Sequence, residues 1–272
     1  MKQNNLKNVW YLTKFDLKNY RKSIIIWSVT IFCITFLYMI LFPSVKEMGQ
    51  MKLEAMPKEL LEFVNMSSME DLENYMVYYA MIISLIIIAI SIFATTFTSK
   101  IINLEEKTKF IEFTNSLEIS RKQILFSKTL TSFIAVLMVC LSAVIANFIC
   151  AYTVGGTTFN LNDTLMITKI TFFIPFFFMS IALFVSGLTG KSVVSGLASG
   201  MVFITYMMGY LSKLIGDKGN FLKYLSPFEM LSPKAVTSLS NETITSYGIL
   251  IMVFIILIVL AHLLYSKRDF RI

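Results

Sequence analysis

The chain has 272 residues, of which 56% are apolar and 15% charged, and its formal net charge is +7. Because soluble domains are about one-quarter charged, this composition excludes an ordinary soluble enzyme, a disordered chain and a disulfide-rich secreted domain. Lys and Arg concentrate in the cytoplasmic loops of membrane proteins, so the positive charge indicates membrane topology and gives no reason to expect a nucleic-acid partner.

The first 22 residues are predicted to form an amphipathic helix that lies on the membrane surface. Apolar side chains recur at helical spacing, and basic side chains occupy the opposite side. The apolar positions are Leu6, Val9, Trp10, Leu17 and Tyr20, and the basic positions are Lys7, Lys14, Lys18 and Arg21. The alternative is a plain basic tail beside the first span.

Six continuous apolar runs follow, each long enough for a helix that rises about 1.5 Å per residue to cross a hydrocarbon layer about 30 Å thick. Their continuity favours helices over the alternating strands of a barrel. The predicted spans are residues 23–42, 75–98, 130–154, 170–188, 193–215 and 247–265. The sequence therefore predicts an all-α membrane protein with six transmembrane helices, in which residues 1–272 form a single domain.

The distribution of basic residues sets the orientation of these spans. Sixteen of the 24 Lys and Arg residues lie in residues 1–22, in residues 99–128, at Lys191 and in residues 266–272, all on one side. That side is predicted to be cytoplasmic. Both termini are then cytoplasmic, as an even number of spans requires.

Two loops on the outer side have a distinct composition. Residues 43–74 carry seven acids against three lysines and are predicted to contain a short helix broken near Pro57. Residues 216–246 contain Leu-Ser-Pro-Phe at 225–228 and a further proline at Pro233. Short apolar stretches with two prolines favour re-entrant or interfacial helices before the last span.

The sequence offers packing chemistry but no catalytic motif. It has no HExxH pattern and no pair of acids inside an apolar run. Residues 190–192 read Gly-Lys-Ser, but a phosphate loop needs a glycine where Val185 stands, so a turn between helices is predicted. Gly196 and Gly200 form a GxxxG step expected to allow close helix packing. Asn147, deep in the third run, is expected to bond a neighbouring helix.

The inner loop between the second and third spans carries the most informative pattern. It reads Asn-Leu-Glu-Glu-Lys at 103–107, Ile-Glu-Phe at 111–113 and Ser-Leu-Glu-Ile-Ser-Arg at 116–121, and it ends at Ser-Lys, 127–128. This order resembles the permease subunits of type-2 ABC exporters, the ABC-2 type transporter family. The basic start, the Leu-Ser-Pro-Phe segment and the Lys-Arg-Asp ending at 267–269 agree. The chain departs from the family pattern at Lys109-Phe110 and at Glu118.

The resemblance implies that this loop holds a short cytoplasmic coupling helix seated in a groove of an ATPase. The residues that it assigns to the ATPase contact are Glu105, Glu106, Glu112, Ser120 and Arg121. It implies two separate ATPase subunits, a second permease chain of the same or a sister kind, and a bacterial plasma membrane. It also implies that this chain holds no cofactor and is not itself an enzyme, because ATP and Mg²⁺ bind in the partner ATPase.

The expected function is therefore that of a permease for ATP-driven export. The spans carry almost no ionisable side chains but many Phe, Met and Ile, which favours an amphipathic or hydrophobic cargo. A membrane-active peptide is the first candidate cargo, and a drug or a lipid follows. The alternative is a membrane protein that does not transport, such as a sensor, a scaffold or a factor giving immunity to a toxic peptide.

Overall fold

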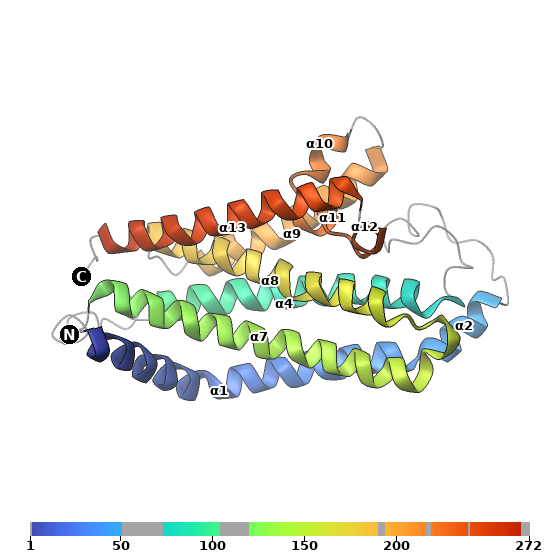
Figure 1. Cartoon of the computed structure of the whole chain (residues 1–272), viewed down its shortest axis with the longest axis horizontal. Coiled ribbons are helices and arrows are strands. Elements are labelled where there is room, and N and C mark those ends of the chain that lie inside the picture. The colour runs from blue at the N-terminus through green and yellow to red at the C-terminus, as the bar shows by residue number, and fades with distance from the viewer. Residues whose placement is uncertain are drawn as a thin grey trace.

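The computed structural model of the protein describes residues 2–50, 73–103, 120–189, 194–215, 219–238 and 240–267, and every regular element within these ranges is a helix. Figure 1 shows an elongated bundle whose long helices run along its longest axis. These helices are α1 (Lys2–Ile40), α4 (Tyr75–Ile102), α7 (Arg121–Val154), α8 (Leu161–Thr189), α9 (Val194–Ile215) and α13 (Asn241–Lys267).

The start of α1 and the end of α13 lie at the same end of the bundle, at the left of Figure 1. The C-terminal ends of α4 and α8 and the starts of α7 and α9 lie at this end as well. We call it the inner end and the opposite end the outer end. The division of the loops that the sequence predicts is therefore present in the structure.

Five helices in the described part of the chain are long and apolar enough to cross a membrane: α1, α4, α7, α8 and α13. The predicted sixth span, residues 193–215, coincides with α9, but α9 does not meet the same criterion. A count of six spans is therefore not confirmed.

Several helices extend beyond the apolar runs that predicted them. Helix α7 begins at Arg121 and α8 at Leu161, well before the predicted starts at residues 130 and 170. Hydropathy locates only the part of a helix that lies in hydrocarbon, whereas backbone hydrogen bonding continues until a cap or a breaker ends it. Asn160 supplies such a start for α8, because its Oδ1 accepts the N–H of Asn162 at 2.9 Å.

The predicted surface helix at residues 1–22 is not confirmed as a separate element. Helix α1 bends along its length but continues without a break into the first apolar run. The sequence explains this continuity, since no Gly or Pro occurs before Pro43. The face that contains Val9, Thr13 and Tyr20 is buried, and α1 packs along α7. Trp10 is instead exposed, and so are Lys7, Lys14 and Lys18.

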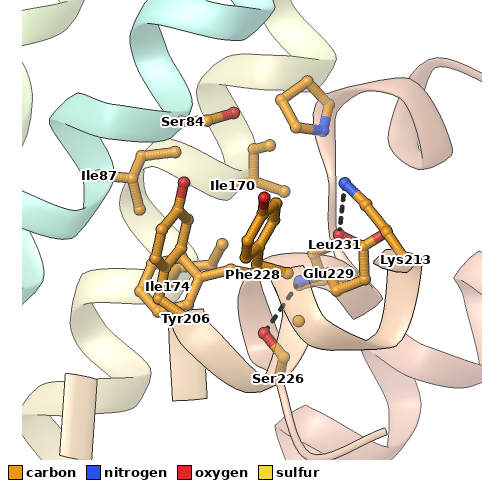
Figure 2. Close-up of a pocket in the computed structure, with 13 residues that line it drawn as sticks. Ser84, Ile87, Ile170, Ile174, Tyr206, Lys213, Ser226, Phe228, Glu229 and Leu231 are labelled. Carbon is orange, nitrogen blue, oxygen red and sulfur yellow. Dashed lines mark hydrogen bonds and ion pairs between the residues drawn. The ribbon is translucent and has the colours of Figure 1, made fainter. Parts of the chain in front are cut away.

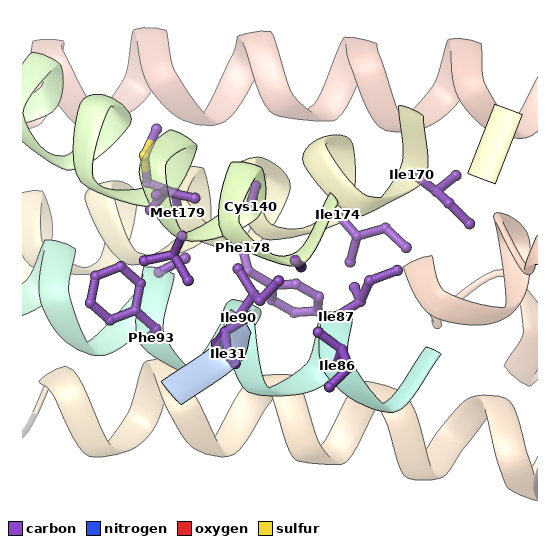
Figure 3. Packing of buried hydrophobic residues seen from close by; sticks show 14 of the residues in the cluster. Ile31, Ile86, Ile87, Ile90, Phe93, Cys140, Ile170, Ile174, Phe178 and Met179 are labelled. Carbon is purple, nitrogen blue, oxygen red and sulfur yellow. The ribbon is translucent and has the colours of Figure 1, made fainter. Parts of the chain in front are cut away.

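The core lies between α4 and α8, and α4 also contacts α1, α7 and α9. Figure 3 shows the isoleucines and Phe93 of α4 interleaved with side chains of α8 and α7. Buried residues drawn there are Ile31, Ile86, Ile87, Ile90, Phe93, Cys140, Ile170, Ile174, Phe178 and Met179. The expectation for Asn147 is confirmed, because its Oδ1 accepts a hydrogen bond from the hydroxyl of Tyr75 in α4 at 3.0 Å.

Short helices occupy the outer end. They are α2 (Phe42–Gln50), the 3₁₀ turn η2 (Gly156–Thr158), α10 (Asn220–Lys223), α11 (Pro227–Met230) and α12 (Pro233–Ser238). The last three fall in the segment for which re-entrant or interfacial helices are predicted. Their depth relative to a bilayer remains a prediction, and the predicted helix near Pro57 lies outside the described residues.

Candidate functional site

At the inner end, the C-terminus of α4 is fastened to α7 by a buried lysine. The Nζ of Lys128 donates to the backbone carbonyl of Ile101 at 2.9 Å, and Lys128 is only 4% exposed. This carbonyl belongs to the last turn of α4, where carbonyls lack partners within the helix and carry partial negative charge. The bond therefore satisfies an orphan acceptor and fixes the point at which the chain leaves α4 for the inner loop.

The chain re-enters the bundle at an equally defined point. Ser120 caps α7: its hydroxyl accepts the N–H of Gln123 at 3.4 Å, and its own N–H donates to the Gln123 side chain at 2.8 Å. This reciprocal pair is a capping box. Ser120, expected as an ATPase contact, is thus also the residue that starts α7. Arg121, expected in the same role, is exposed at the first position of the helix.

Helix α1 joins this inner assembly through two contacts. The hydroxyl of Thr13 lies 3.2 Å from that of Ser127 in α7, and both residues are buried. The Nζ of Lys100 in α4 lies 5.2 Å from the ring centroid of Tyr20, a cation–π arrangement. The ends of α1, α4 and α7 therefore form one connected unit around the base of the inner loop.

The three acidic residues expected to contact an ATPase lie within that loop. Glu105, Glu106 and Glu112 are outside the described residues, so their placement stays a prediction. The described residues on either side define the two fixed points, Asn103 and Ser120, between which the predicted coupling helix lies. A force on the loop would reach α4 and α7 through these points.

The GxxxG step does not pack against any helix in the described part of this chain. A Cβ added at Gly196 or Gly200 would meet no atom within 4 Å. Helix packing at Gly196 and Gly200 therefore remains a prediction, and the partner would be another molecule. The close approach occurs instead at Gly187 of α8, where an added Cβ would lie 3.1 Å from the carbonyl oxygen of Ala261 in α13.

A pocket opens at the outer end between α4, α8, α9 and the short helices α11 and α12, as Figure 2 shows. Isoleucine side chains form its apolar wall, and two tyrosines, two serines and an ion pair supply polar groups. The lining residues are Ser84, Ile87, Ile170, Ile174, Tyr206, Gly209, Tyr210, Lys213, Ser226, Phe228, Glu229, Leu231 and Pro233. The Nζ of Lys213 lies 2.8 Å from a carboxylate oxygen of Glu229.

The predicted Leu-Ser-Pro-Phe segment forms one side of this pocket. Ser226 caps α11, and Phe228 stacks on Phe178 of α8 with ring centroids 5.2 Å apart while it meets Tyr206 of α9 edge-on at 5.7 Å. Gly209 permits this docking, because an added Cβ would lie 2.6 Å from the Ser226 hydroxyl oxygen. The segment is therefore held by packing against two long helices.

Sequence reasoning did not identify the pocket. Its ion pair joins Lys213 of α9 to Glu229 of α11. The pattern of apolar runs placed Lys213 at the end of a span and Glu229 in an outer loop. The available signal was Lys213 at the end of an apolar run, with Gly209 one helical turn before it.

These features define a multi-pass helical membrane protein with an anchored inner loop and a pocket at the opposite end. The chain matches the family described as "ABC-2 family transporter protein" over residues 10–270, and it belongs to that family. This membership confirms the resemblance inferred from the inner loop and makes the chain a membrane component of a transporter whose ATPase is a separate component. No curated protein matches the chain significantly.

Proposed function

We propose that the chain is the permease of an ATP-driven exporter and moves an amphipathic or hydrophobic substrate with energy from a separate ATPase. The family match over nearly the whole chain carries this proposal. A membrane-active peptide is the preferred cargo, with a drug or a lipid next. The acidic loop at residues 43–74 would suit a cationic peptide that leaves the membrane at the outer end.

The inner loop is the proposed coupling element. Lys128 holds the end of α4, and the Ser120 capping box fixes the start of α7. A displacement of the loop would then move both helices, because each end of the loop is attached to a rigid element. Glu105, Glu106, Glu112 and Arg121 would supply the charged contacts with the ATPase.

The proposed assembly has two ATPase subunits and a second permease chain, the same or a sister, in a bacterial plasma membrane. In this arrangement α9 is a sixth span and both termini are cytoplasmic. The common position of the start of α1 and the end of α13 supports an even number of crossings. The excess of Lys and Arg in the inner segments supports the cytoplasmic side.

Reporter fusions test this topology. Reporters placed after residues 60, 160 and 230 are expected to give external signals, because all three positions follow an odd number of proposed crossings. Fusions at the two termini serve as the internal controls. A cytoplasmic signal at any of the three outer positions would contradict the six-span arrangement.

Reversal of Glu105 and Glu106 to Lys tests the coupling. Because the charges of a solvent-facing loop serve a partner more than the fold, the double variant is expected to insert normally. It should lose co-purification of the ATPase in mild detergent or uncouple hydrolysis from transport. The matched control is Glu47→Lys, the same reversal at an exposed carboxylate of α2 at the outer end. Wild-type co-purification, hydrolysis and transport in the double variant would contradict the assignment.

Deletion of the gene tests the cargo. The expected result is increased sensitivity to cationic membrane-active peptides, whereas tolerance to sodium and other small ions should not change. If no ATPase co-purifies with the intact protein, the alternative of a sensor, scaffold or immunity protein is favoured instead.

A further inference from the structure

The outer pocket has a composition that is unusual for the interior of this bundle. Its Lys213–Glu229 pair is mostly shielded, with the two side chains 24% and 19% exposed. A second ion pair, Lys223–Glu242, has an Nζ to oxygen distance of 3.3 Å, and the Glu242 side chain is 78% exposed. A shielded carboxylate must keep a cation beside it, because an unpaired buried charge is costly.

The pocket places aromatic rings and an apolar wall next to this carboxylate. Tyr206 and Glu229 both line the pocket, and Phe228 meets the Tyr206 ring edge-on. Ile87 and Ile174 line the wall away from the pair. A carboxylate beside aromatic faces recognises ammonium and guanidinium groups, and an isoleucine wall accepts an alkyl chain.

We propose that this pocket binds the cationic end of an amphipathic molecule, an ammonium or guanidinium group carried on an apolar chain. In the empty pocket the ammonium of Lys213 occupies Glu229. The ligand's cation displaces it, so that the carboxylate is paired both before and after binding. The released Lys213 side chain moves to the water at the outer end, where its flexible stem allows hydration.

The size of the site limits what it takes. The cavity among the lining residues is about 30 Å³. This is room for about two water molecules, so a cationic head group enters only in place of the Lys213 ammonium, its chain follows the open mouth of the pocket, and a whole folded peptide does not fit. The identification of this ligand as the exported cargo rests on the proposed function, whereas binding at the pocket does not.

The first experiment uses the purified full-length chain, without an ATPase, in detergent micelles. The probe is dodecylguanidinium, and the readout is the rate at which an excess of amine reagent labels Lys213, measured by mass spectrometry. Occupancy should raise this rate several-fold and saturably, because it frees the lysine amine. Lys223 is the matched control, since its partner Glu242 lies outside the pocket lining. No change at Lys213, or an equal rise at Lys223, would overturn the proposal.

Two variants should change the affinity for dodecylguanidinium in opposite directions, which a purely structural role of the ion pair would not produce. Lys213→Met removes the competing cation and should tighten dodecylguanidinium binding several-fold. Glu229→Gln should weaken binding by about tenfold or more, because the carboxylate is lost. Glu242→Gln should leave binding unchanged. Dodecyltrimethylammonium has the same charge and chain length but no N–H donor, so it should bind more weakly. Equal affinity of the Lys213 and Glu229 variants for dodecylguanidinium would overturn the proposal. If a variant does not fold, the labelling experiment on the unaltered chain tests the proposal instead.

Nanodiscs distinguish the two sources of such a cation. Discs of phosphatidylcholine alone are compared with discs that also contain phosphatidylethanolamine, with no probe present. A rise in Lys213 labelling caused by phosphatidylethanolamine identifies the occupant as a lipid headgroup. If only an added cationic peptide raises the labelling, the occupant is the cargo. If no ATPase co-purifies, the proposed function fails but these binding results still stand.

Discussion

Helices α8 and α13 lie side by side, and both are apolar enough to cross a membrane. They differ in how much of their surface is buried in the bundle. In the most apolar stretch of each, the mean hydropathy is 2.1 for α8 and 2.9 for α13. The buried share of the same stretches is 67% for α8 and 11% for α13. The more apolar helix is thus the less buried one. Hydropathy measures compatibility with lipid, whereas burial depends on the shapes that neighbouring helices present.

The contact between the two helices runs along one face of α13. The ring of Phe173 in α8 lies 5.9 Å from that of Tyr247 and 6.5 Å from that of Phe254, and Gly187 brings the backbones together at Ala261. Most of the surface of α13 remains open to lipid or to another chain. Because lipid tails are as apolar as the side chains, close packing along this face determines where α13 sits.

The largest expected effect comes from placing a bulky side chain at Gly187, where the backbones of α8 and α13 lie close together. Gly187→Leu places a side chain against the backbone of Ala261 and should lower the free energy of unfolding by about 3 kcal/mol. The matched control is Gly248→Leu in α13, where an added Cβ meets nothing within 4 Å. Thermal or denaturant unfolding in detergent measures both. Equal destabilisation by the two variants would contradict the described packing of α8 on α13.

A smaller effect is expected from removing the same side chain on each helix. Ile167 of α8 is 1% exposed and Ile255 of α13 is 54% exposed. Ile167→Ala leaves a cavity and should cost about 2 kcal/mol of stability, whereas Ile255→Ala should change stability by less than about 0.5 kcal/mol. The same unfolding measurements test this pair. A larger loss at Ile255 would show that a partner covers α13 in the purified protein.

The smallest effect on the single chain is expected at the GxxxG step of α9. Gly200→Leu should leave the stability of an isolated chain nearly unchanged, because nothing in the described structure lies within 4 Å of an added Cβ. It should weaken assembly if a second permease chain packs on this face, since close backbone contact would be blocked. A native gel in mild detergent separates the two effects. Unchanged assembly would indicate that the step faces lipid.

Much of the helical architecture was predictable, but its details of packing were not. The sequence located the apolar part of each long helix and placed both termini at one end, because run length and charge act locally along the chain. It pointed to Gly196 and Gly200, whose packing role stays a prediction, and it did not single out Gly187, which lies against Ala261 in the structure. Small residues permit close approach anywhere on a helix, and only the neighbouring helix determines which of them is used.

The candidate sites show the same division. The inner loop pattern was sufficient to identify the family, and Ser120 was named as a functional residue, but its capping role depends on where α7 begins. The Lys128–Ile101 bond joins positions 27 residues apart, and the Lys213–Glu229 pair joins α9 to a short helix beyond it. Such pairs depend on how the chain returns after a turn, which periodicity along one helix does not record.

By itself, the sequence determined that this protein is an all-helical membrane chain, because the backbone of a continuous apolar run can satisfy its hydrogen bonds in lipid only as a helix. The inner loop pattern identified it as a member of the ABC-2 family. Only the tertiary structure decided that α8 lies in the core and α13 at its edge, and that Lys213 faces Glu229 in a pocket. In lipid the apolar surfaces of all spans are nearly equivalent, so small differences in shape and single polar contacts select the arrangement.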